Sequence, residues 1–411
     1  MITLAMIWPR FGPLHHARLR ACGKVANVVA IEMSGEDLTY AWDKVPGSDG
    51  FRRITLFPGA DVDALDPYAV TTSLRQQLAT LRPDVVVVPS WGWNYANAAL
   101  YWALSTNTPV VVMSSSSEID RQRIWWQEMV KRQIVGRFQA ALVAGRLQAD
   151  YVAKLGIPRD RIFTGYDAVD NDHFIRGASS IRRDEAGARA KLGLPEKYFL
   201  SVCRFVAKKN LPLLFRAFAK FKDSSPEAAD WHFVLLGDGP MKAELLDLRR
   251  ELGLDGVLHM PGFKQYEELP SYYGLASGFV LPSLEEQWGL VVNEAMSAGL
   301  PVVVSSQCGC APDLVEQGKN GFVFHPNNEQ ELAGHMGVLA SDPGLRASMG
   351  ELSTKLVNRF TCDNFARNLL QASQIALSLP RPRHSVGSRV LLPLLMRRKN
   401  QLDLGDRMRR L

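Results

Sequence analysis

The chain has 411 residues, of which 46% are apolar and 22% are charged, a balance that is typical of globular proteins and excludes a disordered or collagen-like chain. Its length predicts two or three domains, and no apolar run approaches the roughly 18 residues that a membrane-spanning helix needs. The formal net charge is +6, which raises the question of an anionic partner.

The first half alternates strand-like and helix-like stretches. We expect strands at 2–8, 25–31, 54–57, 85–88, 110–113 and 140–144, and helices at 14–22, 71–81, 94–104 and 119–138. The first strand starts without a basic leader, so we do not interpret it as a signal peptide. Residues 85–88 and 110–113 are continuous apolar runs, which are typical of parallel strands buried on both faces. This spacing of strands and helices predicts βαβ units in a doubly wound sheet.

The same alternation restarts after a polar, charged stretch at 170–195, which we interpret as an interdomain linker. Further strands are expected at 198–202, 232–236, 257–260, 278–281 and 301–304, and further helices at 211–222, 242–252 and 289–298. The predicted organisation is an N-terminal Rossmann-like domain, the linker, a C-terminal Rossmann-like domain and a basic tail, at residues 1–169, 170–195, 196–379 and 380–411. The fold class is therefore α/β with two Rossmann-like domains.

The positive charge belongs to the tail. Residues 380–411 hold nine Lys or Arg and two Asp, a net charge of +7, so the rest of the chain has a net charge of −1. The tail has no aromatic residue, which argues against nucleic acid as a partner. Its apolar run 390–396 lies directly before Arg397-Arg398-Lys399, a composition that suits an anionic membrane surface, and the segment 121–137 adds Trp125, Trp126 and five basic residues. The alternative is an extra segment that is disordered or packs on the domain.

The five cysteines are an odd and scattered set, which indicates a reducing compartment. We therefore expect a cytoplasmic protein, with peripheral attachment to the inner face of the membrane. Two Asp-x-Asp triplets, at 61–63 and 170–172, match a metal-binding pattern that is common by chance, and Cys308-Gly309-Cys310 lacks a second ligand pair at zinc spacing. We expect no metal site.

The segment 282–295 is the most informative for chemistry. Glu286 follows a predicted strand and lies at the carboxyl edge of the sheet, where α/β proteins bind ligands, and Glu294 follows eight residues later in a helix. The helix start at Gly289, Leu290 and Val291 offers backbone N–H groups and a positive dipole end to a phosphate. Two ordinary acidic residues at a helix start remain the alternative at this point.

A second pair of residues favours a ligand site. Arg204 and Lys209 span the turn between the first strand of the second domain and the next helix, so both cations can reach the same edge. Arginine can bind a diphosphate bidentately and lysine acts as a point charge. The strand-turn Gly237-Asp238-Gly239-Pro240, taken alone, indicates only a turn.

Together these motifs make residues 201–324 resemble the donor-binding domain of the retaining family 4 (group 1) glycosyltransferases, which have the GT-B fold of two domains facing across a cleft. The motifs that carry the resemblance are Arg204-x4-Lys209-Asn210, Gly237-Asp238-Gly239-Pro240, VLHMPGF at 257–263, Tyr272-Tyr273, Phe279-Val280-Leu281-Pro282-Ser283, Glu286-x7-Glu294-Ala-Met-Ser-Ala-Gly-Leu-Pro-Val and Asn320-Gly321-Phe322. The first half resembles the family less, through Gly12 and residues 161–174.

The resemblance implies a nucleotide-sugar donor. Arg204 and Lys209 would hold its diphosphate, Glu286 would contact the sugar, and Glu294 would contact the ribose. The remaining donor contacts implied are Phe263 beside the base, the backbone at Gly289, Leu290 and Val291, and Gly12 in the first domain. Two cations and a helix end would stabilise the departing diphosphate without a metal or other cofactor. The acceptor would be a hydroxyl of a lipid-linked or surface-polysaccharide glycan.

The first half departs from the family pattern where a histidine often follows a strand, because residues 114–117 are serines. His15 and His16, which follow Gly12, are the alternative candidates to supply an imidazole ring on the acceptor side. Ser115 and Glu118 are further acceptor-side candidates. We expect transfer with retention through an oxocarbenium-like state, in which the leaving phosphate takes the acceptor's proton. A nucleotide-sugar epimerase of the same fold and a non-catalytic polysaccharide-assembly partner are the alternative functions.

Overall fold

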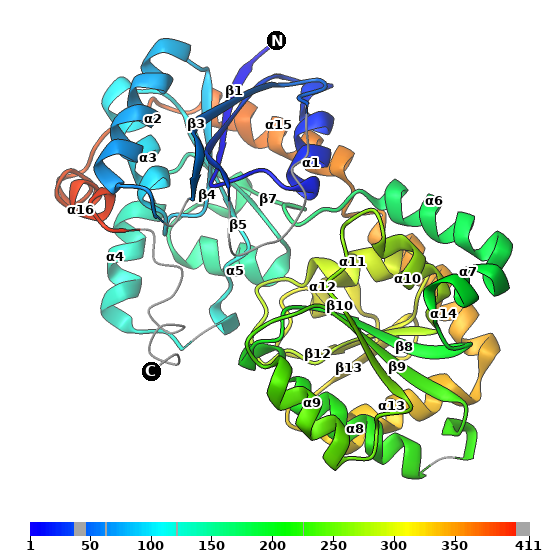
Figure 1. Cartoon of the computed structure of the whole chain (residues 1–411). Coiled ribbons are helices and arrows are strands. Elements are labelled where there is room, and N and C mark those ends of the chain that lie inside the picture. Colours follow the sequence, from blue (N-terminus) through cyan, green and yellow to red (C-terminus); the bar gives the residue numbers. More distant parts are fainter. Residues whose placement is uncertain (37–46, 62–63, 121, 225, 400–411) are drawn as a thin grey trace. The chain divides into compact units, whose positions relative to one another are not determined.

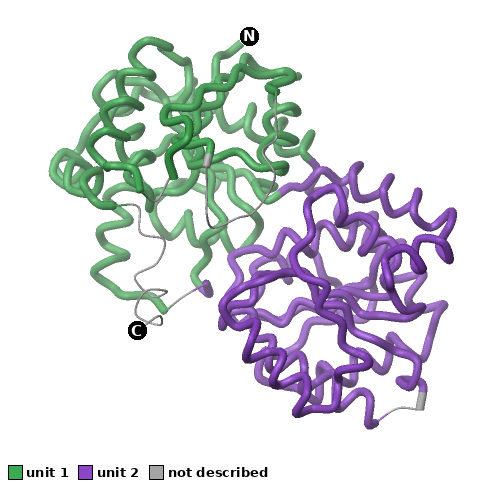
Figure 2. Tube along the Cα trace, in the orientation of Figure 1, with its two compact units in different colours: residues 1–118, 122–167, 362–411 green, residues 119–121, 168–361 purple. Residues whose placement is uncertain are grey.

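The computed structural model describes residues 1–36, 47–61, 64–120, 122–224 and 226–399. The chain forms two compact units (Figure 2). Unit 1 contains residues 1–118, 122–167 and 362–411, and unit 2 contains residues 119–121 and 168–361. Each unit is an α/β structure built on one parallel sheet, as predicted for two Rossmann-like domains (Figure 1).

The sheet of unit 1 has the strand order β3-β2-β1-β4-β5-β6-β7, with every pair parallel. Its strands are β1 (Thr3–Trp8), β2 (Asn27–Glu36), β3 (Arg52–Asp61), β4 (Val85–Pro89), β5 (Val110–Ser114), β6 (Ala140–Val143) and β7 (Ile162–Thr164). Strands β4 and β5 are buried at every residue, as their continuous apolar runs predict. The short edge strand β7 was not predicted, because none of its residues is fully buried and its sequence has no long apolar run.

Helices from both ends of the chain cover this sheet. They are α1 (Pro13–Gly23), α2 (Pro67–Leu81), α3 (Asn94–Thr106), α4 (Trp125–Val135), α5 (Arg146–Lys154), α15 (Cys362–Ser378) and α16 (Val386–Met396). The predicted helix at 119–138 is wrong at its start, because the Arg123 side chain donates to the backbone carbonyls of Ser117 and Glu118 and holds the preceding segment in another conformation.

The sheet of unit 2 has the strand order β10-β9-β8-β11-β12-β13, again with every pair parallel. Its strands are β8 (Lys197–Val202), β9 (Trp231–Leu236), β10 (Leu258–Gly262), β11 (Gly278–Leu281), β12 (Val302–Ser305) and β13 (Gly321–Phe324). Its helices are α6 (Asn171–Ile181), α7 (Glu185–Leu192), α8 (Leu211–Ser224), α9 (Lys242–Glu251), α10 (Leu269–Leu275), α11 (Leu290–Ser297), α12 (Ala311–Leu314), α13 (Glu329–Ser341) and α14 (Pro343–Val357).

The stretch 170–195 differs from the predicted linker, because it forms α6 and α7 and belongs to unit 2. Phe174 and Ala178, one helical turn apart, bury the inner face of α6. The arginines that made this stretch look like a linker bind backbone carbonyls: Arg182 donates to Gly274 (2.8 Å) and to Ala298 (2.7 Å) at the ends of α10 and α11. Basic side chains satisfy helix C-terminal carbonyls well, so a charged sequence here forms packed structure.

The C-terminal boundary also differs from the prediction, since residues 362–379 belong to unit 1, where α15 packs against α1. Of the basic tail, residues 386–396 form α16, whose Leu392 is buried in the core of unit 1. The packing alternative therefore holds for one face of this helix. The last basic residues, Arg407, Arg409 and Arg410, lie outside the described residues.

Candidate functional site

The predicted donor residues of unit 2 lie in loops at the carboxyl edge of its sheet. Strands β8 and β11 are adjacent and parallel, so the loops that follow them leave from the same edge. Arg204 follows β8, and Lys209 ends a short 3-10 helix before α8. Glu286 lies in the loop between β11 and α11. The sheet order thus brings together the two motifs that are 77 residues apart in the chain.

Lys209 and Glu286 form an ion pair in which Lys209 Nζ donates to Glu286 Oε2. Their side chains are only 14% and 17% exposed, and Ser283 Oγ donates to the same carboxylate oxygen at 3.3 Å. Burial alone would lower the pKa of Lys209, but the Glu286 carboxylate raises it above its ordinary value. The lysine therefore keeps its charge in a half-buried position, and Arg204 is exposed at the start of the same loop.

Backbone hydrogen bonds hold these loops in place. Leu284 N donates to Lys208 O (2.8 Å), and Gly309 N donates to Glu286 O (2.9 Å). Asn210 has a left-handed backbone (φ 56°), and its side-chain amide donates to Pro282 O (3.2 Å) and Pro326 O (2.7 Å). Asn210 thus ties the loop of Lys209 to the loop of Glu286. The motif contained this residue, but its spacing gave no sign of this positioning role.

The start of α11 has the predicted geometry for an anion. Gly289 is the N-cap with φ 106°, a conformation that suits glycine, and an added Cβ would lie 2.9 Å from Leu281 Cδ2. The helix then begins at Leu290 and Val291, whose amides belong to the first turn at the positive end of the helix dipole. These amides follow directly on the loop that carries Glu286.

Glu294 lies in the second turn of α11 and is 5% exposed. Tyr273, from α10, donates its hydroxyl proton to Glu294 Oε2 at 2.7 Å. Burial raises the pKa of Glu294 to about 7, although the Tyr273 hydrogen bond opposes this shift. The carboxyl group therefore changes its charge near neutral pH. The sequence placed Tyr273 in a motif but did not reveal this contact.

The turn Gly237-Asp238-Gly239-Pro240 does more than reverse the chain. A Cβ on Gly237 would lie 1.8 Å from Cys203 O, and one on Gly239 would lie 2.6 Å from Phe205 O. Phe205 N donates to Asp238 O at 2.9 Å. Because only glycine permits this approach, the turn supports the loop that carries Arg204. Phe263, which is 37% exposed, follows β10 beside this turn, where Gly237 N donates to Gly262 O.

The predicted residues of unit 1 separate into different environments. Gly12 is the N-cap of α1, and its backbone N–H donates to His15 Nδ1 at 3.2 Å. Burial, with smaller effects of Arg18 and His16, lowers the pKa of His15 to about 3, so its ring is neutral at pH 7. His16 is buried beside Phe51, and its Nε2 lies 3.4 Å from Arg53 Nη1. His15 thus lies at the helix start, and His16 packs in the interior.

The other two acceptor-side candidates lie apart from each other. Ser115 Oγ donates to Asp167 Oδ2 at 2.5 Å, and Asp167 is also 3.8 Å from the Arg18 guanidinium. Glu118 forms an ion pair with Lys154 in which both side chains are more than half exposed. The buried pair of Arg18 and Asp167 beside Ser115 was not predicted, because the residues come from three distant parts of the sequence.

The cysteines are free thiols, and Asp170 of the second Asp-x-Asp triplet caps a helix. All five cysteines are free thiols, and Cys310 N donates to Trp288 O (3.1 Å), which packs residues 308–310 against the Glu286 loop. Asp170 caps α6 by accepting from His173 N. The triplet 61–63 lies partly outside the described residues. Among the residues that the structure describes, no group of three or more His, Cys, Asp or Glu could hold a metal ion.

The sequence matches two family models that follow one another along the chain. Residues 16–164 match the glycosyl transferase 4-like domain, and residues 183–356 match the glycosyl transferases group 1. Only residues 1–15, 165–182 and 357–411 lie outside the two matches. With two parallel α/β units and the donor-domain motifs at one sheet edge, the chain belongs to the group 1 glycosyltransferases and has the GT-B fold.

Curated relatives are similar in sequence to part of this chain. A sulfoquinovosyl transferase of Arabidopsis thaliana is 27% identical over 304 residues, which are 71% of this chain and 56% of that protein. An uncharacterized glycosyltransferase of Methanocaldococcus jannaschii is 28% identical over 59% of this chain and 61% of its own. The chain thus spans less than two thirds of the length of these relatives.

Solved structures support the fold. A sucrose-phosphate synthase from Thermosynechococcus elongatus superposes with a TM-score of 0.73 at 19% identity and covers 92% of this chain and 100% of its own. The Anabaena protein HepE, solved in complex with UDP, superposes with a TM-score of 0.69 at 17% identity with the same coverage.

Proposed function

We propose that the protein is a retaining glycosyltransferase that moves a sugar from a nucleoside-diphosphate sugar to a hydroxyl of a lipid-linked or surface-polysaccharide glycan. The observation that carries the proposal is the half-buried pair of Lys209 and Glu286 beside the start of α11, with Arg204 on the same sheet edge. HepE, which shares the fold, has also been solved with UDP-glucose, and this supports a nucleotide sugar as the donor.

In the proposed complex the diphosphate replaces Glu286 as the anionic partner of Lys209. Lys209 and Glu286 neutralise each other in the free protein. When phosphate oxygens bind Lys209 and Arg204, Glu286 is released to accept hydrogen bonds from the sugar hydroxyls. Glu294, as a carboxylate, accepts from the ribose, and Phe263 lies beside the base. When Lys209 exchanges Glu286 for the diphosphate, the phosphate-binding and the sugar-binding parts of the proposed donor site are thus prepared together.

The reaction breaks the bond between the anomeric carbon and the diphosphate oxygen and forms a bond from that carbon to the acceptor oxygen. The acceptor's proton passes to the leaving diphosphate, on the same face of the sugar, which gives retention. Arg204, Lys209 and the amides at Gly289, Leu290 and Val291 stabilise the negative charge that develops on the leaving group. These groups are fixed parts of the protein, so we propose that transfer needs no metal.

Unit 1 is proposed to hold the acceptor, with Gly12 and the neutral His15 at the start of α1 as its candidate contacts. No helix in the described part of the chain is long and apolar enough to cross a membrane. A peripheral position at the cytoplasmic face of a membrane would give the protein access to a lipid-linked acceptor. The epimerase and the non-catalytic alternatives are not favoured, because both family models are of glycosyltransferases. The charged residues of the proposed donor site are also all present, namely Arg204, Lys209, Glu286 and Glu294.

The experiment is to incubate the protein with a panel of UDP-, GDP- and ADP-sugars and candidate glycan acceptors and to follow product by mass spectrometry. The anomeric configuration of the product is then read by proton NMR. We expect an α linkage from an α-linked donor. A β product would contradict retention. Inversion of a stereocentre in the donor's sugar without transfer to an acceptor would favour an epimerase.

A further inference from the structure

Helix α4 exposes its aromatic residues. Trp125 and Trp126 are 73% and 53% exposed, and Ile124 and Met129 beside them are 44% and 55% exposed. Trp125, Trp126 and Met129 lie within one arc of the helix at 3.6 residues per turn. A helix on the surface of a water-soluble domain normally turns such residues toward the core, so this exposed apolar arc indicates a binding surface.

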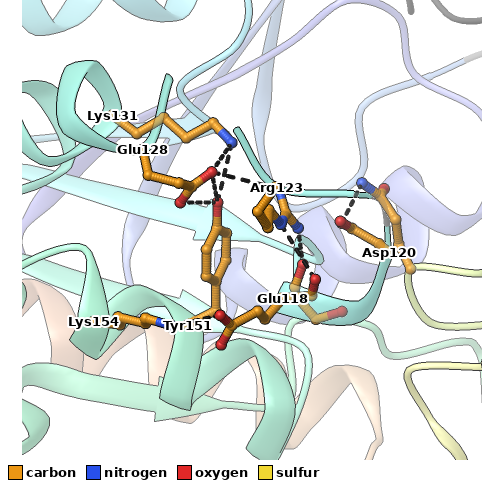
Figure 3. A network of polar contacts seen from close by, with 9 residues as sticks. Glu118, Asp120, Arg123, Glu128, Lys131, Tyr151 and Lys154 are labelled. Carbon is orange, nitrogen blue, oxygen red and sulfur yellow. Dashed lines mark hydrogen bonds and ion pairs between the residues drawn. The ribbon is translucent and has the colours of Figure 1, made fainter. Parts of the chain in front are cut away.

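The opposite side of α4 holds its charged residues against the unit. Lys131 Nζ donates to Glu128 Oε1 (2.6 Å), and the Tyr151 hydroxyl donates to Glu128 Oε2 (2.9 Å). Arg123 lies 4.4 Å from the centroid of the Tyr151 ring and 4.0 Å from Glu128. Figure 3 shows Glu128 and Lys131 meeting at the hydroxyl of Tyr151. This network fixes the rotation of α4, so the tryptophans are held outward.

Helix α16 adds a second exposed apolar stripe next to α4. Val386, Val390 and Leu394 follow one another at four-residue intervals and are 85%, 59% and 55% exposed, while Leu392 on the other face is buried. The two helices are in contact: Gly387 lies against the side chain of Gln133, which belongs to the exposed arc of α4. We call the exposed side chains of residues 124–133 and 386–399 the α4–α16 face.

The charge on this face has one sign. Its exposed ionisable residues are Arg132, Arg389, Arg397, Arg398 and Lys399. Residues 385–399 contain no Asp or Glu, and Glu128, the acid of α4, is half-buried and paired. Exposed tryptophans and aliphatic residues surrounded by basic residues are the composition of a helix that lies in a membrane interface.

We propose that the α4–α16 face docks the protein on an anionic lipid bilayer. A second copy of the chain fits this face less well, because a two-fold interface would set its basic residues against each other. Nucleic acid would leave the aliphatic stripe of α16 without an apolar partner. The inference goes beyond the transfer reaction, and its test needs neither donor nor acceptor, so either proposal can fail alone.

The test is flotation of the full chain with vesicles of phosphatidylglycerol and phosphatidylcholine in equal parts, and with vesicles of phosphatidylcholine alone. We expect binding to the anionic vesicles only. The variant R397Q/R398Q/K399Q should reduce the partition coefficient about tenfold or more, since one basic residue near such a surface changes it by about fivefold. The variant W125A/W126A should also reduce it about tenfold or more, because it removes apolar area that would be buried in the interface. Tyr68→Ala removes an aromatic that is 77% exposed on α2 and should leave flotation unchanged.

All substituted side chains are exposed, and equal thermal unfolding of the variants confirms that they are folded. Sedimentation analysis of the same proteins measures self-association. Flotation that is insensitive to both variants overturns the proposal. It is also overturned if W125A/W126A abolishes a dimer and leaves vesicle binding intact, or if the protein binds RNA through this face and does not bind the vesicles.

Discussion

The Tyr273 hydroxyl is predicted to keep Glu294 ionised for donor binding. Its hydrogen bond to Glu294 Oε2 is 2.7 Å long and buried. Burial, and the neighbouring Glu294 charge, raise the pKa of Tyr273 above its ordinary value, so the hydroxyl retains its proton as a donor. The substitution Tyr273→Phe removes this one donor and preserves the ring, which packs 5.6 Å from Phe174 between centroids.

The size of the effect follows from the hydrogen bond. A hydrogen bond to a charged group contributes about 1.5–3 kcal/mol, and one pKa unit corresponds to about 1.4 kcal/mol, so the pKa of Glu294 should rise by roughly one to two units from its value of about 7. At pH 7 the ionised fraction then falls from about one half to roughly 1–10%. Donor affinity, if it requires the carboxylate, falls about 5- to 50-fold at this pH.

The assay is isothermal titration of the nucleoside diphosphate of the preferred donor from pH 6 to pH 9. In the wild type the dissociation constant should rise as the pH falls below about 7, because a proton must leave Glu294 before the ribose binds. In Tyr273→Phe the same rise should begin at higher pH, and affinity should recover at alkaline pH. Glu294→Gln should bind weakly without this pH dependence.

The matched control is Tyr272→Phe, which makes the same change at the adjacent residue of α10. The Tyr272 side chain hydrogen bonds with Lys264, whereas it is Tyr273 that donates to Glu294, so the pH profile of Tyr272→Phe should follow the wild type. A Tyr273→Phe profile that coincides with the wild type at every pH would refute the reasoning. A uniform loss of affinity without a shift along the pH axis would show that Tyr273 is only structural.

Three further predictions concern the same site. Glu294→Gln should raise the free energy of unfolding at pH 8 by up to about 3 kcal/mol and leave it unchanged near pH 4. The reason is that a carboxyl group whose pKa is higher in the folded state than its unfolded value of 4.5 destabilises the fold as the pH rises. Urea unfolding at both pH values measures this difference. Lys209→Ala should reduce turnover by about a hundredfold, the scale of one lost electrostatic stabiliser, while Lys208→Ala on the same turn should retain near-normal turnover; equal turnover in the two would remove Lys209 from the mechanism. Gly289→Ala should weaken donor binding and lower the melting temperature, since φ is 106° there, whereas Gly256→Ala, where an added Cβ meets nothing within 4 Å, should change neither.

Much of the fold could be predicted because its strands are continuous apolar runs. Residues 85–88 and 110–113 are buried on both faces, and such runs signal parallel strands without any tertiary information. The linker prediction is wrong because it rests on the polar, charged composition of 170–195, whereas in the structure Arg182 binds the carbonyls at the ends of α10 and α11. That role depends on carbonyls 92 and 116 residues further along the chain, and local composition carries no information about them.

The sequence predicts which residues meet at the candidate donor site but not which of their side chains pair. The motifs placed Lys209, Glu286 and Glu294 at one sheet edge, as parallel topology requires. Which side chains touch, as in the pairs Lys209–Glu286 and Tyr273–Glu294, depends on side-chain geometry across different elements. The same holds for α16, whose apolar residues divide between the core and the surface only once its packing against α3 and α4 is known.

The most direct test of the central claim is calorimetric titration of UDP, GDP and ADP into the wild type and into Lys209→Ala, all in EDTA. The account predicts that one nucleoside diphosphate binds the wild type without a metal and that Lys209→Ala weakens this binding at least about tenfold, the loss of a charge-assisted contact. Failure of the wild type to bind any of the three, or equal affinity in Lys209→Ala, would contradict a diphosphate site at the edge formed by β8 and β11.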